Sequence, residues 1–319
     1  SSGTKPENET LTNEVFDLYL SKPIKQAQLY RSIAKILGKT VERVVSESTS
    51  KYEKDLAIKI PLKILLAEDN RINQKLAKKV FEKMGYIIDI AANGLEVIEA
   101  LERQKYDIIF MDIQMPEMDG MEATAEIVKI MGKDRPRIIA MTANAMQGDR
   151  EKCLAAGMDD YTTKPIRVDQ IKAALKQWGA KKGSIKGYKI KTKEEKSLMD
   201  WKMIDSIKSL DAADDEGQLL LELVTSFLGD FKDSVKSMQE ASEKKSSKEL
   251  EMISHRIKGS AANLGAKGFA KCCFKIETKA RNENFNNLKL NYDELNHVFV
   301  KTVEEYKLYF VEIGKKLVI

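Results

Sequence analysis

Residues 108–120 read IIFMDIQMPEMDG, and this stretch decides the fold class. Four apolar residues precede Asp112, and a loop that contains proline and glycine follows it. A short apolar run bounded by turn residues is typical of a strand buried in a parallel sheet. Comparable runs occur at 63–67, 86–91, 137–143 and 160–164, separated by amphipathic stretches. Five strand–helix alternations with short connections predict a parallel sheet with helices on both faces.

Polar side chains follow these predicted strands at the point where each one ends. They are Glu68, Asp69, Asp112, Thr142 and Lys164. Ligands bind beyond the carboxyl ends of the strands in open parallel sheets, so we expect these groups to meet there. Three carboxylates repel one another unless a cation lies among them, and their hard oxygens suit Mg²⁺. With a hydroxyl and an ammonium nearby, this set can stabilise a phosphoryl group in transfer to a carboxylate, of which Asp112 is the central one.

Four short motifs in residues 62–180 resemble the receiver domains of two-component signalling. They are Glu68-Asp69, Met111-Asp112 with Met115-Pro116-Glu117-Met118-Asp119-Gly120, Met141-Thr142-Ala143 and Lys164-Pro165-Ile166. The resemblance implies a flavodoxin-like (βα)5 fold with a five-stranded parallel sheet.

The same resemblance implies a role for each matched residue. Asp112 would accept the phosphoryl group. Asp69, Asp112 and the backbone carbonyl of Gln114 would hold Mg²⁺, with Glu68 acting through water. Lys164 and Thr142 would contact the phosphoryl group, and Thr142 and Tyr161 would move together as a switch.

Residues 199–319 lack strand-like runs, and their apolar residues recur at helical spacing, which predicts an all-helical bundle. In the stretch 249–266 one inward stripe consists of Leu250, Ile253, Ile257, Ala261 and Leu264. At about 100° per residue, His255 lies roughly 160° from Ile257. We therefore expect an exposed imidazole, with Lys258 one turn further on and Gly259 leaving room beside it.

The segment His255–Ala266 resembles histidine-containing phosphotransfer (HPt) domains, and the resemblance covers about residues 199–315. These domains are four-helix bundles that carry a phosphoryl group on one histidine. The resemblance implies that His255 is that histidine, with Lys258 as its basic neighbour and Gly259 on the docking surface.

Composition excludes several other classes of protein. Two histidines and three cysteines, two of which are adjacent, provide neither a multi-histidine metal site nor a disulfide framework. The apolar runs fall short of the roughly 18–20 residues of a membrane span, so we expect no membrane contact by this fragment. Free cysteines fit a reducing, cytoplasmic location for the fragment, which leaves open a membrane anchor elsewhere in a parent kinase. The net charge is +5, and residues 181–198 alone hold seven lysines and two glutamates. This basic stretch is typical of a linker, so no nucleic-acid partner is expected.

An internal repeat suggests how the chain is organised. Residues 17–24 align with residues 159–166, each ending in Lys-Pro-Ile. Residues 1–45 therefore resemble the last strand and helix of a preceding receiver-like unit, with a cloning remnant as the alternative. We expect linkers at 46–61 and 181–198 between this tail, the receiver domain at 62–180 and the HPt domain at 199–319.

These features together predict the C-terminal part of a hybrid sensor histidine kinase that acts in a phosphorelay. An upstream kinase histidine would phosphorylate Asp112, which would pass the group to His255 and then to a separate response regulator. Glycine-rich ATP-binding motifs are absent, so the chain should not phosphorylate itself from ATP.

Three alternatives fit the sequence less well. A haloacid dehalogenase-type hydrolase needs a second aspartate two residues after the nucleophile, where this chain has Gln114. An inert scaffold would lack Asp112 or Lys164, and both are present. A DNA-binding regulator needs a basic helix-turn-helix, whereas the helical segment offers His255.

Overall fold

The computed structural model describes residues 55–142, 147–179, 197–211, 215 and 217–318. The chain divides into two compact units, residues 1–51 and 52–319, and the described residues all belong to the second. The predicted receiver-like tail at 1–45 and most of both predicted linkers lie outside the described residues.

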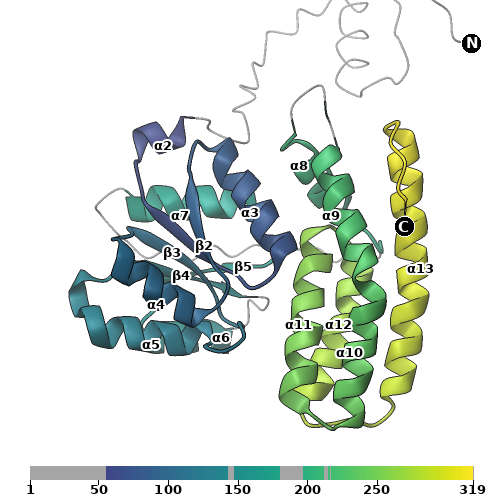
Figure 1. The fold of residues 1–319 in the computed structure, drawn as a ribbon. Helices are drawn as coiled ribbons and strands as arrows, with labels where there is room; N and C mark the ends of the chain where they lie inside the picture. Colours follow the sequence, from purple (N-terminus) through teal and green to yellow (C-terminus); the bar gives the residue numbers. More distant parts are fainter. Residues whose placement is uncertain (1–54, 143–146, 180–196, 212–214, 216, 319) are drawn as a thin grey trace, which may run out of the picture. The chain divides into compact units, whose positions relative to one another are not determined.

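The first domain of this unit is built on a five-stranded parallel sheet in the order β2-β1-β3-β4-β5, which confirms the prediction (Figure 1). The strands are β1 (Ile64–Ala67), β2 (Ile88–Ala91), β3 (Ile108–Asp112), β4 (Arg137–Thr142) and β5 (Asp160–Thr163). Every residue of β1 and β3 is buried, as expected of central strands without a solvent face. The strand order reverses between β1 and β3, which places a crevice at their carboxyl ends.

Helices cover both faces of this sheet because alternate strand residues point to opposite sides. Leu66 and Phe110 pack in one apolar cluster with α3 (Arg71–Lys83) and α7 (Val168–Gly179). Leu65 and Ile109 pack in the other, and the helices on that side are α4 (Gly94–Arg103), α5 (Gly120–Met131) and α6 (Gln147–Ala155). A short 3-10 helix, η1, spans Gly132–Asp134.

The start of α5 depends on a glycine. A Cβ on Gly120 would lie 2.1 Å from the backbone oxygen of Asp112, so a side chain there would collide with the end of β3. Asp119 caps the helix by accepting from the backbone N–H groups of Met121 and Glu122, while Glu122 reaches back to the Asp119 N–H. The Pro- and Gly-containing loop therefore returns the chain tightly against the carboxyl end of β3.

A helix that was not predicted precedes the sheet, inside the segment expected to be a linker. Helix α2 spans Leu56–Lys59, and the Leu56 side chain is only 1% exposed. The Tyr86 hydroxyl donates to the Ile60 carbonyl at 2.7 Å. The α/β domain thus begins before residue 62, with a turn too short to show helical periodicity in the sequence.

The second domain is helical. Its helices are α8 (Trp201–Lys208), α9 (Gln218–Gly229), α10 (Phe231–Glu243), α11 (Ser247–Asn263), α12 (Lys267–Arg281) and α13 (Leu288–Glu312). Phe231 on α10 stacks on Phe299 of α13 at 3.6 Å between ring centroids, and both rings approach Phe269 of α12. With α11 packed between α10 and α12, helices α10–α13 form the predicted four-helix bundle.

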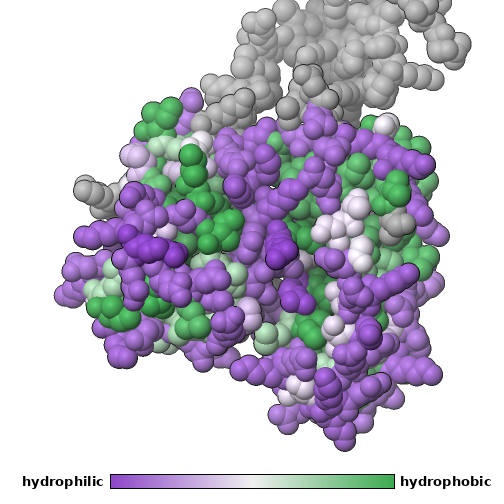
Figure 2. Space-filling model, in the orientation of Figure 1, coloured by the Kyte–Doolittle hydropathy of each residue, from purple (hydrophilic) through white to green (hydrophobic). Residues whose placement is uncertain are grey.

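The two domains touch along helices α3, α9 and α11. Figure 2 shows a largely hydrophilic surface on the visible face of both domains, with apolar residues in separate small groups. Among the described residues, no helix has the length and hydropathy needed to cross a membrane.

Candidate functional site

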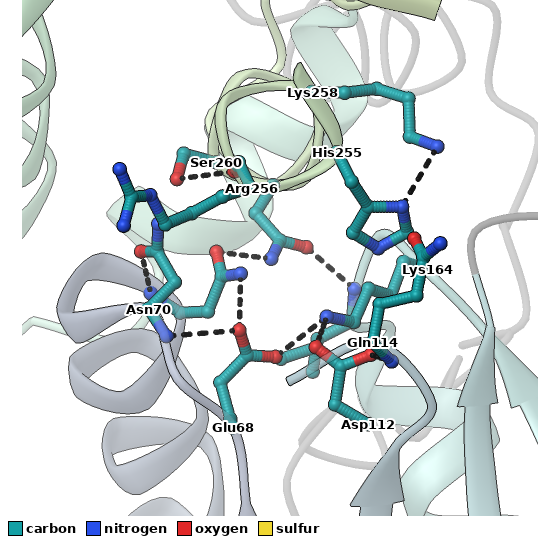
Figure 3. A network of polar contacts seen from close by, with 12 residues as sticks. Glu68, Asn70, Asp112, Gln114, Lys164, His255, Arg256, Lys258 and Ser260 are labelled. Atoms are coloured by element: carbon teal, nitrogen blue, oxygen red, sulfur yellow. Dashed lines mark hydrogen bonds and ion pairs between the residues drawn. The ribbon is translucent and has the colours of Figure 1, made fainter. Parts of the chain in front are cut away.

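Three carboxylates meet at the carboxyl ends of β1 and β3. Oxygen atoms of Glu68, Asp69 and Asp112 lie within 4.8 Å of one another. The Lys164 ammonium, which follows β5, lies 2.8 Å from Glu68 Oε2 and 2.5 Å from Asp112 Oδ2 (Figure 3). Thr142 ends β4 and is buried at the same edge. The structure therefore brings these five predicted residues to one edge of the sheet.

Burial makes the negative charge of this cluster costly. It raises the pKa of Asp112 to about 6, although the Lys164 ammonium acts in the opposite direction. Burial and the neighbouring Glu68 likewise raise the pKa of Asp69 to about 6. Burial also disfavours the Lys164 charge, but Asp112 and Glu68 outweigh it and raise the pKa of this lysine above its usual value. One lysine does not neutralise three carboxylates, so the cluster favours a further cation.

The oxygen donors fit Mg²⁺, which prefers a few carboxylates together with water and phosphate oxygens. Gln114 lies next to this group, and its backbone N–H donates to Asp112 Oδ1 at 3.3 Å. The Gln114 side chain points away toward the helical domain, where Nε2 donates to Glu251 Oε1 at 3.1 Å. The backbone of Gln114 thus lies near the cluster while its amide contacts the second domain.

His255 lies on α11, and the prediction that it is exposed is wrong. The residue is only 8% exposed. The predicted direction of the side chain, away from the core of the bundle, holds, but in that direction the α/β domain covers it. His255 and Asp112 line one cavity of about 270 Å³, together with Thr142 and Lys258. A water molecule occupies about 30 Å³ of liquid, so the cavity has room for a phosphoryl group and several waters.

A buried carboxylate of α12 determines which imidazole nitrogen carries the proton. His255 Nδ1 lies 2.9 Å from Glu277 Oε1, and Lys258 Nζ donates to Glu277 Oε2 at 2.5 Å. Burial favours the protonated acid, yet the hydrogen bond from His255 and the charge of Lys258 lower the pKa of Glu277 below its usual value. An ionised carboxylate can only accept, so Nδ1 donates to it. The lone pair is then on Nε2, which is buried and has no hydrogen-bond partner within the described part of the chain.

Burial also lowers the pKa of Lys258, although Glu277 favours its charged form. The Lys258 ammonium lies 3.4 Å from His255 Nδ1. Arg281 approaches the same carboxylate, with Nη2 3.3 Å from Glu277 Oε1. Three basic groups therefore surround one buried acid beside the cavity.

Sequence reasoning missed Glu277, Asn263 and Asn73. The sequence did contain an indication for Glu277. Its position falls on the apolar face of α12, which also carries the buried residues Cys273, Ile276 and Ala280. A charge within an apolar stripe needs a buried partner. Asn263 lies two turns after His255, on the same face of α11.

Two comparisons with protein families agree with this geometry. Residues 64–176 match the model of the response regulator receiver domain, and residues 222–298 match the model of the Hpt domain. The chain joins a receiver domain to an Hpt domain. Receiver and Hpt domains act in phosphorelay signalling, and this chain carries one of each.

The similar proteins are histidine kinases, and several of them, from Dictyostelium discoideum, are named as hybrid kinases. A probable histidine kinase 1 of Oryza sativa subsp. indica is 42% identical over 148 residues, which cover 36% of this chain and 15% of that protein. The signal transduction histidine-protein kinase BarA of Escherichia coli is 28% identical over 230 residues, 70% of this chain and 24% of that protein. The chain thus spans a quarter or less of these two relatives and corresponds to the receiver–Hpt part of a hybrid kinase.

A solved structure resembles the receiver domain alone. It is the receiver domain of sensor histidine kinase PA1611 from Pseudomonas aeruginosa, which contains a magnesium ion in its active-site cleft. It is 43% identical and covers 37% of this chain and 97% of that chain, with a TM-score of 0.35.

Proposed function

We propose that Asp112 accepts a phosphoryl group and transfers it to His255 of the same chain. The observation that carries this proposal is the shared cavity, which has the carboxylate on one wall and the imidazole on another. Figure 3 shows the His255 ring facing the Asp112–Lys164 pair. The orientation of the ring by Glu277 supports it, because Nε2 is left as the nucleophilic nitrogen on the cavity side.

The transfer exchanges one bond for another. The Nε2 lone pair of His255 attacks phosphorus, the P–N bond forms, and the P–O bond to Asp112 breaks with its electrons returning to the carboxylate. The proton on Nδ1 stays in place, so the imidazole gains positive charge that the Glu277 carboxylate stabilises. Lys164 stabilises the returning Asp112 carboxylate through its 2.5 Å contact.

The acidic cluster would hold Mg²⁺ through Glu68, Asp69, Asp112 and the backbone carbonyl of Gln114. The ion would supply positive charge to the phosphoryl oxygens. Thr142 and Lys258, which line the cavity, would contact those oxygens, and Tyr161 would respond together with Thr142 as a switch. A kinase histidine would supply the phosphoryl group to Asp112, and a separate response regulator would receive it from His255.

Phosphopeptide mapping tests this proposal. The wild type, Asp112→Asn and His255→Gln are incubated with Mg²⁺ and acetyl phosphate and analysed without acid. We expect label on Asp112 in the wild type and in His255→Gln, and label on His255 only where Asp112 is intact. Label on His255 in Asp112→Asn, or label on Asp112 that never reaches His255, would contradict transfer within the chain.

A further inference from the structure

One face of α11 lies against the receiver domain. His255, Gly259 and Asn263 are spaced four residues apart, so they form a line along one side of the helix. A Cβ on Gly259 would lie 3.4 Å from Nδ2 of Asn73 on α3. Glycine thus lets the backbone of α11 approach α3 closely at the centre of this line.

Asn263 uses both ends of its amide to contact the receiver. Its Oδ1 accepts from the backbone N–H of Ile166 at 2.7 Å, and its Nδ2 donates to Asn73 Oδ1 at 2.8 Å. Asn73 in turn donates through Nδ2 to Glu68 Oε1 at 2.8 Å. Asn263 is 0% exposed and Asn73 is 1% exposed. A chain of buried hydrogen bonds therefore runs from the Hpt helix to the acidic cluster.

Both receiver partners of Asn263 are tied to the reacting groups. Ile166 lies two residues after Lys164, and Asn73 holds Glu68. Docking of α11 is thus sensitive to the shape of the acidic site itself. By contrast, the ion pair between Lys75 and Glu222 at the same interface has side chains almost half exposed. Exposed ion pairs contribute little binding free energy, so the buried amides contribute more to the specificity of the interface than this ion pair does.

We propose that the Asn73–Asn263 amide pair is a latch that seats the Hpt domain on the receiver domain of its own chain and closes His255 to other proteins. A receiver without an amide at the position of Asn73 would leave the Asn263 donor buried and unpaired, which is costly. The latch therefore selects this receiver over others. Any separate response regulator must reach the same imidazole, so onward transfer, which rests on the proposed function, requires the latch to open.

The latch can be tested without any phosphoryl group, so its failure is distinct from failure of the proposed relay. The chain has two histidines, and diethyl pyrocarbonate acylates accessible neutral imidazoles. His297 is exposed on α13 and serves as an internal reference, whereas His255 is covered. Peptide mass spectrometry gives the rate at each histidine in one sample of the full chain.

We expect His255 of the wild type to react at least tenfold more slowly than His297. Asn263→Ala should raise the rate at His255 at least tenfold and leave His297 unchanged. Asn73→Ala breaks the latch from the receiver side with an intact Hpt sequence, and it should raise the His255 rate in the same way. Glu222→Gln, at the exposed ion pair, is the matched control and should change neither rate.

Hydrogen exchange gives a second measurement. The Ile166 amide should be protected in the wild type and exchange at least tenfold faster in Asn263→Ala, while amides within the core of the bundle keep their protection. The proposal is overturned if His255 of the wild type reacts as fast as His297. It is also overturned if Asn73→Ala and Asn263→Ala leave the His255 rate and the Ile166 exchange unchanged.

Discussion

Replacement of Glu277 by glutamine should slow phosphorylation of His255 while sparing Asp112. Glutamine keeps the shape and can still accept from His255 Nδ1, but it removes the negative charge 2.9 Å from that nitrogen. A hydrogen bond to a charged group contributes about 1.5–3 kcal/mol and a neutral one about 0.5–1.5 kcal/mol. The difference, on the order of 1–1.5 kcal/mol, corresponds to about tenfold in rate or equilibrium.

An opposing effect is smaller. Loss of the Glu277 charge also removes its repulsion of the phosphoryl oxygens, but these bind beyond Nε2, on the far side of the ring from Glu277. The contact with Nδ1 is direct, so its loss dominates. Glu277→Asp keeps the charge with a shorter side chain and should restore part of the rate.

The assay measures transfer from Asp112 to His255 after a pulse of acetyl phosphate and Mg²⁺. Glu294→Gln is the matched control, because Glu294 pairs with Lys275 on the same domain but is 43% exposed. We expect about tenfold slower transfer in Glu277→Gln and no change in the control. Equal transfer rates in wild type and Glu277→Gln, with equal labelling of Asp112, would refute the role of the carboxylate.

The pH dependence provides a second criterion. The pKa of Glu277 lies below its usual value, so the carboxylate stays ionised at neutral pH. Its contribution to transfer is present while the carboxylate is ionised and is lost as the pH falls through its pKa in the folded protein. The difference between wild type and Glu277→Gln should therefore persist at neutral pH and narrow only under acid conditions.

Substitutions at three other positions probe the docking face, the acidic site and the stability of the sheet. Gly259→Ala should keep the rate of transfer to His255 within about twofold of the wild-type rate, because the added Cβ meets Asn73 at an ordinary contact distance of 3.4 Å. Gly259→Gln carries a longer side chain and should slow transfer more than tenfold in the same pulse assay. Lys164→Ala should leave Asp112 able to accept label but abolish the change in amide exchange that phosphorylation produces; an unchanged response would count against its role. Hydrogen bonds from Arg135 and Arg137 outweigh burial and lower the pKa of Asp159, so Asp159→Asn should lower the urea midpoint at pH 7, and this difference should shrink as the pH falls below 3.8.

The sheet and its acidic edge were predictable because each depends on local pattern. The apolar run before Asp112 is long enough for a buried strand, and the position of the carboxylate at its end results from the chain direction. The motif ending in Lys164 indicated the fifth strand, although its own residues are only half-buried. Strand order and register then determine which side chains meet, and parallel sheets leave few choices.

The environment of His255 was not predictable from its helix alone. A helical projection gives the direction of a side chain relative to its own helix, but it says nothing of another domain in that direction. The contact between His255 and Glu277 could not be predicted for the same reason, because it depends on how α12 packs against α11. Helix α2 was not predicted for a different reason. Its four residues are too few to show the helical repeat of apolar positions.

The polar character of the α11 docking face has a consequence for how often the contact can be made and broken. The line of imidazole, glycine and amide buries no large apolar side chain. These three residues can return to water without exposing a large apolar side chain of their own. A leucine-rich contact would bind more tightly but would expose an apolar surface whenever the domains separate. The face is thus suited to repeated use, in which each partner is recognised by the hydrogen bonds it can complete.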